Sequence, residues 1–145
     1  MHDTNAGSRL PRAVLVDVDG TLAHADGRDI MDFSQVGLDR VDETIAEIVR
    51  IFAAAGLTVV VMSGRKETCR RQTEVWLAVA DVPSDALLMR DRYDDRPDVQ
   101  VKRDLYDRHV RGRYDVLCVL DDRSSVVQGW RDLGLTCLQV APGDF

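Results

Sequence analysis

Residues 13–22 read AVLVDVDGTL, an apolar run that breaks at Asp19-Gly20. Such a run is typical of a buried strand that leads directly into a turn. It predicts a strand over Ala13–Val18, with Asp17 and Asp19 at its end. Since these aspartates are two positions apart, both carboxyl groups can project into one crevice if the chain begins to turn at Gly20.

The same kind of apolar run recurs along the chain and alternates with helical periodicity. Further strands are predicted at Leu57–Met62, Ala86–Met89, Val116–Leu120 and Thr136–Val140, and helices at Leu38–Ala55, Glu67–Ala80, Val99–Val110 and Ser124–Leu133. No predicted strand has a clean polar face. Continuous apolar strands between amphipathic helices indicate a parallel sheet covered on both sides. The sequence therefore predicts an α/β fold, a three-layer doubly wound parallel sheet.

Length and composition are those of one globular domain: 145 residues, of which 45% are hydrophobic and 30% charged. We expect a flexible tail over residues 1–10 and a single domain over residues 11–145. No apolar run approaches the roughly 20 residues that span a bilayer, and the opening residues lack the apolar core of a signal peptide. These features predict a cytoplasmic protein with no membrane contact.

Buried apolar positions account for the cysteines and tryptophans. Cys69, Cys118 and Cys137 are an odd number without metal-type spacing, so we expect reduced packing residues. Trp76 and Trp130 lie at apolar helical positions and are expected in the core. The net charge of -6 argues against a broad electrostatic grip on nucleic acid, which requires many neutralised phosphates.

Reactive groups follow three of the predicted strands, and parallel topology brings these strand ends to one edge of the sheet. The groups are Asp17 to Thr21, Ser63-Gly64-Arg65, and Asp121-Asp122-Arg123. Up to four carboxylates would meet there and repel one another unless a cation lay among them. Hard oxygen ligands of this kind suit Mg²⁺.

Positive charge is available for a phosphate ligand. Lys102 and the arginines can supply it, and arginine offers paired donors to phosphate oxygens. The arginines near the strand ends and loops are Arg28, Arg65, Arg90 and Arg123. This balance of charges fits phosphoryl transfer, in which an aspartate can accept the phosphoryl group covalently.

The order of these motifs resembles that of the haloacid dehalogenase (HAD) superfamily: DVDGTL at 17–22, a strand ending in Ser63, Lys102, and Asp121-Asp122. The chain is still more similar to the 3′-phosphatase domain of phage-type polynucleotide kinase/phosphatase. That similarity covers nearly the whole chain and includes VVVMSGR at 59–65 and QVAPGDF at 139–145.

The resemblance implies a HAD-like Rossmannoid fold and a Mg²⁺-dependent phosphomonoester hydrolase with an aspartyl-phosphate intermediate. It implies a catalytic set of Asp17 (nucleophile), Asp19 (general acid and base), Ser63 and Lys102 (phosphoryl contacts). It implies substrate-binding positions at Thr21, Arg28, Gly64, Arg65, Arg90, Asp98 and Arg123. It implies metal ligands at Asp17, Asp19 (through its backbone carbonyl), Asp121 and Asp122.

The chain departs from the two-domain enzyme because it contains no GxxxxGK[ST] phosphate loop, so 5′-end phosphorylation is not expected. Residues 23–62 leave no room for a large cap domain, and an open site favours a bulky substrate. The expected function is hydrolysis of terminal 3′-phosphomonoesters of DNA or RNA, with opening of 2′,3′-cyclic phosphates as a further reaction. The alternatives are a small-molecule phosphatase acting on nucleotides or sugar phosphates, and an inactive domain that binds nucleic-acid ends for a separate kinase or ligase.

Overall fold

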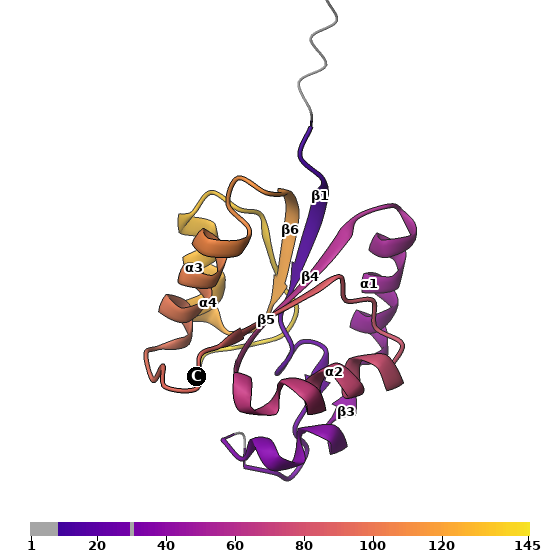
Figure 1. The fold of residues 1–145 in the computed structure, drawn as a ribbon, viewed down its shortest axis with the longest axis vertical. Helices are drawn as coiled ribbons and strands as arrows, with labels where there is room; N and C mark the ends of the chain where they lie inside the picture. The colour runs from indigo at the N-terminus through magenta and orange to yellow at the C-terminus, as the bar shows by residue number, and fades with distance from the viewer. Residues whose placement is uncertain (1–8, 30) are drawn as a thin grey trace, which may run out of the picture.

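A five-stranded parallel sheet forms the middle layer of the computed structural model, which describes residues 9–29 and 31–145 (Figure 1). The strands are β1 (Arg12–Val16), β4 (Thr58–Lys66), β5 (Ala86–Arg90), β6 (Asp115–Asp121) and β7 (Cys137–Gln139). Their order is β5-β4-β1-β6-β7, and every neighbouring pair is parallel. The chain therefore adds strands first on one side of β1 and then on the other, which confirms the doubly wound prediction.

Helices cover both faces of the sheet, because alternate residues of each strand point to opposite faces. One core contains α1 (Glu43–Ala54) and α2 (Arg70–Val79), with Val14 and Val16 of β1. The other contains α3 (Asp98–His109) and α4 (Ser124–Asp132), which pack on the opposite face of the sheet with Leu15 of β1. Trp76, Trp130 and the three reduced cysteines are all buried, as predicted.

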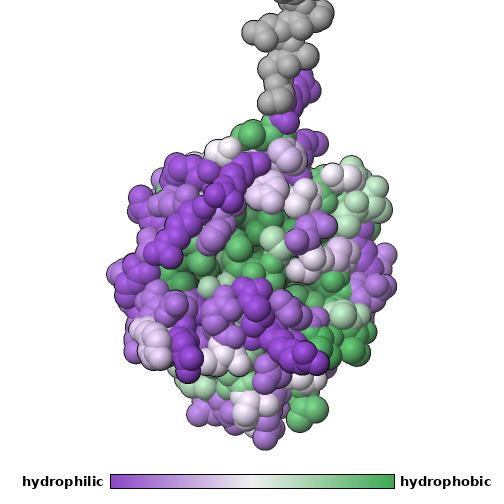
Figure 2. Space-filling model, in the orientation of Figure 1, coloured by the Kyte–Doolittle hydropathy of each residue, from purple (hydrophilic) through white to green (hydrophobic). Residues whose placement is uncertain are grey.

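The edge of the sheet at β5 is only partly covered. Figure 2 shows hydrophobic side chains in the centre of this face, surrounded by hydrophilic ones. Leu87 and Leu88 of β5 have intermediate burial, whereas Met89 is buried.

The predicted helix Leu38–Ala55 was wrong at its N-terminal end. Helix α1 begins only at Glu43, because Asp42 is its N-cap and accepts a hydrogen bond from the backbone N–H of Ile45. Leu38 instead ends a 3-10 helix, η1 (Phe33–Leu38), and its side chain is 82% exposed. The region before α1 also contains an antiparallel pair, β2 (Ala23–His24) with β3 (Arg40–Val41). The segment between β1 and α1 is therefore short and is not a large cap domain, as expected.

Strand β4 is longer than predicted, running through Ser63 to Lys66. Its pairing with β5 is irregular between these two residues. Such an irregularity bends a strand and changes the direction of its side chains. Ser63, Gly64 and Arg65 therefore belong to a distorted strand end and not to a loop. The predicted helix Glu67–Ala80 begins with a short 3-10 turn, η2 (Glu67–Cys69), before α2.

The predicted tail over residues 1–10 lies largely outside the described residues. Arg9 and Leu10, which the structure describes, are exposed. The two hydrophobic cores lie on opposite faces of one sheet, which is consistent with a single domain. The domain boundary at residue 11 stays a prediction. Among residues 9–29 and 31–145, no helix has the length and apolar character needed to cross a membrane.

The central position of β1 leads to a stability prediction. Leu15 is 1% exposed, and Leu15→Ala should lower the free energy of unfolding by about 2–5 kcal/mol, because it removes buried methyl groups and leaves a cavity. Leu138→Ala on edge strand β7 is the matched control, since Leu138 is 49% exposed and should lose about 1 kcal/mol or less. Urea unfolding of both variants measures the difference. Equal losses would contradict this account of the core.

Candidate active site

The carboxyl ends of β1, β4 and β6 meet at one edge of the sheet, beside a cavity of about 330 Å³. Most of the predicted site residues line this cavity. They are Asp17, Asp19, Gly64, Arg65, Arg90, Asp98, Asp121, Asp122 and Arg123. Lys102, Thr21, Ser63 and Arg28 are not part of the lining. The first two contact Asp17 from behind, whereas Ser63 and Arg28 contact Arg65 and Asp39.

Lys102 lies behind the cavity and joins two acidic residues of its lining, Asp17 and Asp121. Its Nζ lies 2.7 Å from Asp17 Oδ1 and 2.9 Å from Asp121 Oδ2, and its side chain is 2% exposed. Burial alone would lower the pKa of Lys102, but Asp121 and Asp17 together raise that pKa above its usual value. The lysine is therefore a permanent cation between the ends of β1 and β6, and not the solvated surface lysine that base rates favour.

Asp17, Asp121 and Asp122 form a buried acidic trio. Each offers a carboxylate oxygen, and these atoms lie within 4.8 Å of one another. Burial, followed by the negative charge of Asp121, raises the pKa of Asp17 well above its usual value, although Lys102 opposes the shift. Burial likewise raises the pKa of Asp122. The trio has more negative charge than one lysine can neutralise, and its oxygen donors suit Mg²⁺.

Local backbone geometry makes the trio possible. Gly20 has φ +83°, a conformation that L side chains rarely adopt, and a Cβ there would overlap the carboxylate of Asp122. The Thr21 hydroxyl lies 3.2 Å from Asp17 Oδ2 and 3.4 Å from Asp122 Oδ1, so its single proton can be donated to either carboxylate. The Asp122 backbone N–H donates to Asp121 Oδ1.

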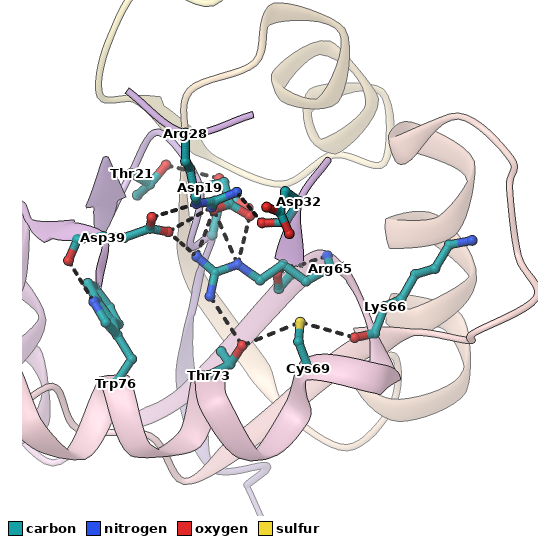
Figure 3. A network of polar contacts seen from close by, with 12 residues as sticks. Asp19, Thr21, Arg28, Asp32, Asp39, Arg65, Lys66, Cys69, Thr73 and Trp76 are labelled. Atoms are coloured by element: carbon teal, nitrogen blue, oxygen red, sulfur yellow. Dashed lines mark hydrogen bonds and ion pairs between the residues drawn. The ribbon is translucent and has the colours of Figure 1, made fainter. Parts of the chain in front are cut away.

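Asp19 has a different environment from Asp17, although only one residue separates them. Its carboxylate is outside the acidic trio and accepts hydrogen bonds from Arg65, at 3.0 Å from Nε and 2.8 Å from Nη2. Arg28 Nη2 lies 3.6 Å from Asp19 Oδ1. Figure 3 shows both guanidinium groups converging on this carboxylate. The metal role that the sequence resemblance implies for Asp19, through its backbone carbonyl, stays a prediction, because the acidic trio consists of side chains and does not include the Asp19 carboxylate.

Asp39 and Thr73 complete this network and were missed in the sequence. Arg28 donates to both Asp39 oxygens, at 2.7 and 2.8 Å, and Arg65 donates to Asp39 Oδ2 and Thr73 Oγ1. Asp39 lay inside the incorrectly predicted start of a helix, where an aspartate is unremarkable. Its position between a 3-10 helix and β3 could be recognised only from tertiary structure.

The β4 bend brings Gly64 against Asp98. A Cβ on Gly64 would overlap the Asp98 carboxylate, so glycine permits this close approach. Arg90 joins the two, donating from Nε to the Gly64 carbonyl at 2.7 Å and from Nη2 to Asp98 Oδ1 at 2.9 Å. Ser63 is fully buried, and its Oγ accepts from the Arg65 backbone N–H.

The C-terminal segment forms another wall of the cavity, which sequence reasoning did not assign. Phe145 lines the cavity, is 68% exposed, and has the Arg123 guanidinium carbon 4.8 Å from its ring centroid. The Ser124 N–H donates to the Gly143 carbonyl, and a Cβ on Gly143 would overlap the backbone of Asp122. The segment is therefore packed directly against the acidic pair.

Comparison with known proteins gives matches over most of the chain. Residues 11–145 match the family described as "Polynucleotide kinase PNKP phosphatase domain". A protein of Autographa californica nuclear polyhedrosis virus, described as "Putative bifunctional polynucleotide kinase/RNA ligase", is 37% identical over 130 residues. That match covers 88% of this chain and 19% of the viral protein.

Among solved structures, a chain of the Pnkp1/Rnl/Hen1 RNA repair complex is 40% identical with a TM-score of 0.92, covering 94% of this chain and 44% of that one. The class C acid phosphatase of Bacillus anthracis with tungstate bound has a TM-score of 0.66 at 14% identity, covering 95% of this chain and 69% of its own. The D,D-heptose 1.7-bisphosphate phosphatase of B. bronchiseptica, complexed with magnesium and phosphate, has a TM-score of 0.61 at 15% identity, covering 90% and 80%. The last two share the fold.

The chain spans less than half the length of the viral and RNA-repair relatives. Its own match to the family nevertheless extends over nearly all of its residues, including every motif at the strand ends. The chain therefore belongs to the HAD-like phosphatase domains of the polynucleotide kinase/phosphatase (PNKP) family.

Proposed function

We propose that this domain hydrolyses terminal 3′-phosphomonoesters of RNA or DNA through an aspartyl-phosphate formed on Asp17. The contact of Lys102 with Asp17, which lines an open cavity, carries the proposal, in a chain that belongs to the PNKP phosphatase family. A phosphoryl group that entered this cavity would meet an Asp17 carboxylate that is held by the positive charge of Lys102 directly behind it. Such positioning and charge neutralisation provide most of the catalysis in phosphoryl transfer.

The two aspartates of the DVDGT motif have separate roles in this proposal. The Asp17 carboxylate attacks phosphorus, and the bond to the 3′ oxygen breaks as Asp19 donates a proton to that oxygen. Asp19 then takes a proton from water, which attacks the phosphoaspartate and releases inorganic phosphate. The family resemblance assigns the phosphoryl contacts to Ser63 and Lys102, which are buried directly behind residues of the cavity lining. The two carboxylates have different partners, Arg65 for Asp19 and Lys102 for Asp17, and the division of roles follows the family resemblance.

The acidic trio fits a magnesium ion. The side chains of Asp17, Asp121 and Asp122 would hold it together with the Asp19 backbone carbonyl. The support is the spacing of the three carboxylate oxygens and their excess negative charge. When bound, Mg²⁺ neutralises negative charge on the transferring phosphoryl group.

The substrate assignment is supported by the shape and lining of the cavity. No large cap covers the site, and Phe145 and Phe33 line the cavity together with the catalytic aspartates. Phe33 is partly buried, whereas Phe145 is 68% exposed, and an exposed ring beside a phosphate site suits a terminal nucleotide, whose base can stack on it. A 2′,3′-cyclic phosphate presents the same end and is a second substrate to assay. The net charge of -6 favours instead a small phosphate monoester, which needs no extended basic surface.

We further propose that the domain acts beside an end-joining or end-phosphorylating activity. A similar chain is found in a complex with Rnl and Hen1 in RNA repair, and the viral relative is described as combining polynucleotide kinase and RNA ligase. Removing a 3′-phosphate leaves a 3′-hydroxyl, which a ligase would then use.

Asp17→Asn tests the nucleophile, because it keeps the size of the side chain but removes the attacking carboxylate. Phosphate release from a 3′-phosphorylated oligonucleotide should fall by about 10⁴-fold or more. Asp107→Asn, which changes an exposed aspartate on α3, is the control and should keep full activity. Unchanged turnover by Asp17→Asn would reject the mechanism. Faster wild-type turnover of free nucleotides or sugar phosphates than of the oligonucleotide would reject the substrate.

Magnesium binding should stabilise the folded protein, because the acidic trio forms only in the native state. At a concentration one hundred times the dissociation constant, the gain is about 2.7 kcal/mol. A thermal melt in MgCl₂, compared with NaCl of equal ionic strength, measures it. Asp122→Asn should lose most of the gain. An identical melting temperature in both salts would count against a metal at this site.

Phe145→Ala tests the stacking of a terminal base. Loss of one stacking contact is worth about 1–3 kcal/mol, so KM for an oligonucleotide 3′-phosphate should rise by about 5- to 150-fold. KM for glycerol phosphate, which has no base, should stay within about twofold. Tyr93→Ala is the matched control, because Tyr93 is also exposed beside an arginine, 5.1 Å from Arg92, but lies outside the cavity lining. Equal changes for both substrates would contradict base stacking.

A further inference from the structure

We propose that Asp39 is a positioning residue that fixes the Asp19 carboxylate through the guanidinium group of Arg65. This inference rests on the proposed role of Asp19 in proton transfer and adds a residue that none of the strand-end motifs contains. Asp39 lies between η1 and β3, twenty residues beyond Asp19 in the chain. Figure 3 shows Arg65 between the two aspartates.

Arg65 makes one hydrogen bond or more from each of its three guanidinium nitrogens. Nε and Nη2 donate to Asp19, Nη2 also donates to Asp39 Oδ2 at 2.8 Å, and Nη1 donates to Thr73 Oγ1 at 3.1 Å. The side chain has no exposed surface. A planar group held at three nitrogens cannot rotate, so the carboxylate that it grips is fixed as well.

Charge balance explains why Asp39 is needed. Arg28 and Arg65 carry two positive charges, and Asp19 and Asp39 carry two negative charges. Each arginine lies beside both aspartates. Both guanidinium groups are at least 90% buried, and buried charges are stable only when they are paired. Without Asp39, Arg28 and Arg65 would lose the carboxylate that both of them contact at 2.7–2.8 Å. Arg28 Nη2, now 3.6 Å from Asp19 Oδ1, would then compete with Arg65 for it.

Asp39 does not reach the substrate cavity. It is absent from the lining, its side chain is 2% exposed, and its backbone carbonyl accepts the indole N–H of Trp76 at 2.9 Å. Its carboxylate is held from the opposite side by Arg28, at 2.7 Å from Nε to Oδ1. Asp39 therefore acts on the reaction through Arg65 and is not itself a catalytic residue.

Asp19, by contrast, lines the cavity and is 23% exposed. General acid catalysis requires its oxygen to be within hydrogen-bonding distance of the leaving oxygen. Because Arg65 donates hydrogen bonds to both Asp19 oxygens, the Asp19 carboxylate keeps one orientation toward the cavity. Asp39 thus keeps the Asp19 carboxylate in position for the step in which the leaving oxygen is protonated.

The test compares leaving groups in Asp39→Asn, which keeps size and removes charge. The value of kcat/KM reports phosphoryl transfer to Asp17, which needs a proton donor for an alkyl leaving group but hardly for p-nitrophenolate. For glycerol phosphate and an oligonucleotide 3′-phosphate, kcat/KM should fall by about 10- to 100-fold, part of the contribution of a general acid. For p-nitrophenyl phosphate it should change by less than about threefold. Asp26→Asn is the matched control: Asp26 lies in the same segment and pairs with Arg40, and both are more than half exposed.

Equal losses for alkyl and aryl substrates would show a merely structural effect and overturn the proposal, as would no loss for either. If Asp39→Asn fails to fold in a thermal melt, Thr73→Val replaces it. Thr73→Val keeps the shape of the side chain and removes the hydrogen bond to Arg65 Nη1. It should lower kcat/KM for alkyl phosphates about three- to tenfold more than for p-nitrophenyl phosphate. If alkyl and aryl substrates respond alike, the proposal is overturned. A wild type that prefers small phosphates would reject the 3′-end assignment while leaving the comparison of glycerol and p-nitrophenyl phosphate valid. A wild type inactive on every ester would overturn both.

Discussion

The buried ammonium group of Lys102 is the interaction on which the rest of the site depends. Burying a lysine charge costs several kcal/mol, and only close partners offset that cost. Here the partners are Asp17 and Asp121, at 2.7 and 2.9 Å, from segments more than one hundred residues apart in sequence. The contact ties α3 to the ends of β1 and β6. Because neither carboxylates nor lysine could be buried alone, the catalytic centre can form only when the sheet and α3 pack together.

The two polar networks on either side of β1 differ in charge balance. Lys102 lies beside three buried acidic residues, and burial, followed by the negative charge of Asp121, raises the pKa of Asp17 and Asp122. Around Asp19 the numbers of aspartates and arginines are equal. The first network therefore has carboxylate oxygens that could hold a cation, whereas in the second each aspartate contacts an arginine. The two aspartates of one short motif, Asp17 and Asp19, thus belong to networks of different charge balance.

The sequence predicted those parts of the site that follow from strand order. Asp17, Asp121 and Asp122 end buried parallel strands, so their meeting at one sheet edge could be expected before any coordinates. Lys102 was found only through the motif resemblance, since nothing local distinguishes it from a surface lysine. Asp39 was missed for a physical reason: the apolar spacing from Leu38 onward continues the period of α1, and only the cap at Asp42 interrupts the helix. Phe145 was also unassigned, because its place beside the site depends on how Gly143 packs on the Asp122 backbone.

The segment before α1 connects the rim of the cavity with the proton-transfer group. Phe33 lines the cavity, and Asp39, at the other end of η1, holds Arg65. In an enzyme without a large cap, the substrate itself must exclude water from the reacting atoms. A terminal nucleotide pressed against Phe33 would therefore rest on the same short helix that fixes Asp19. Under the proposed function, binding at the rim and alignment of Asp19 would therefore depend on one structural element.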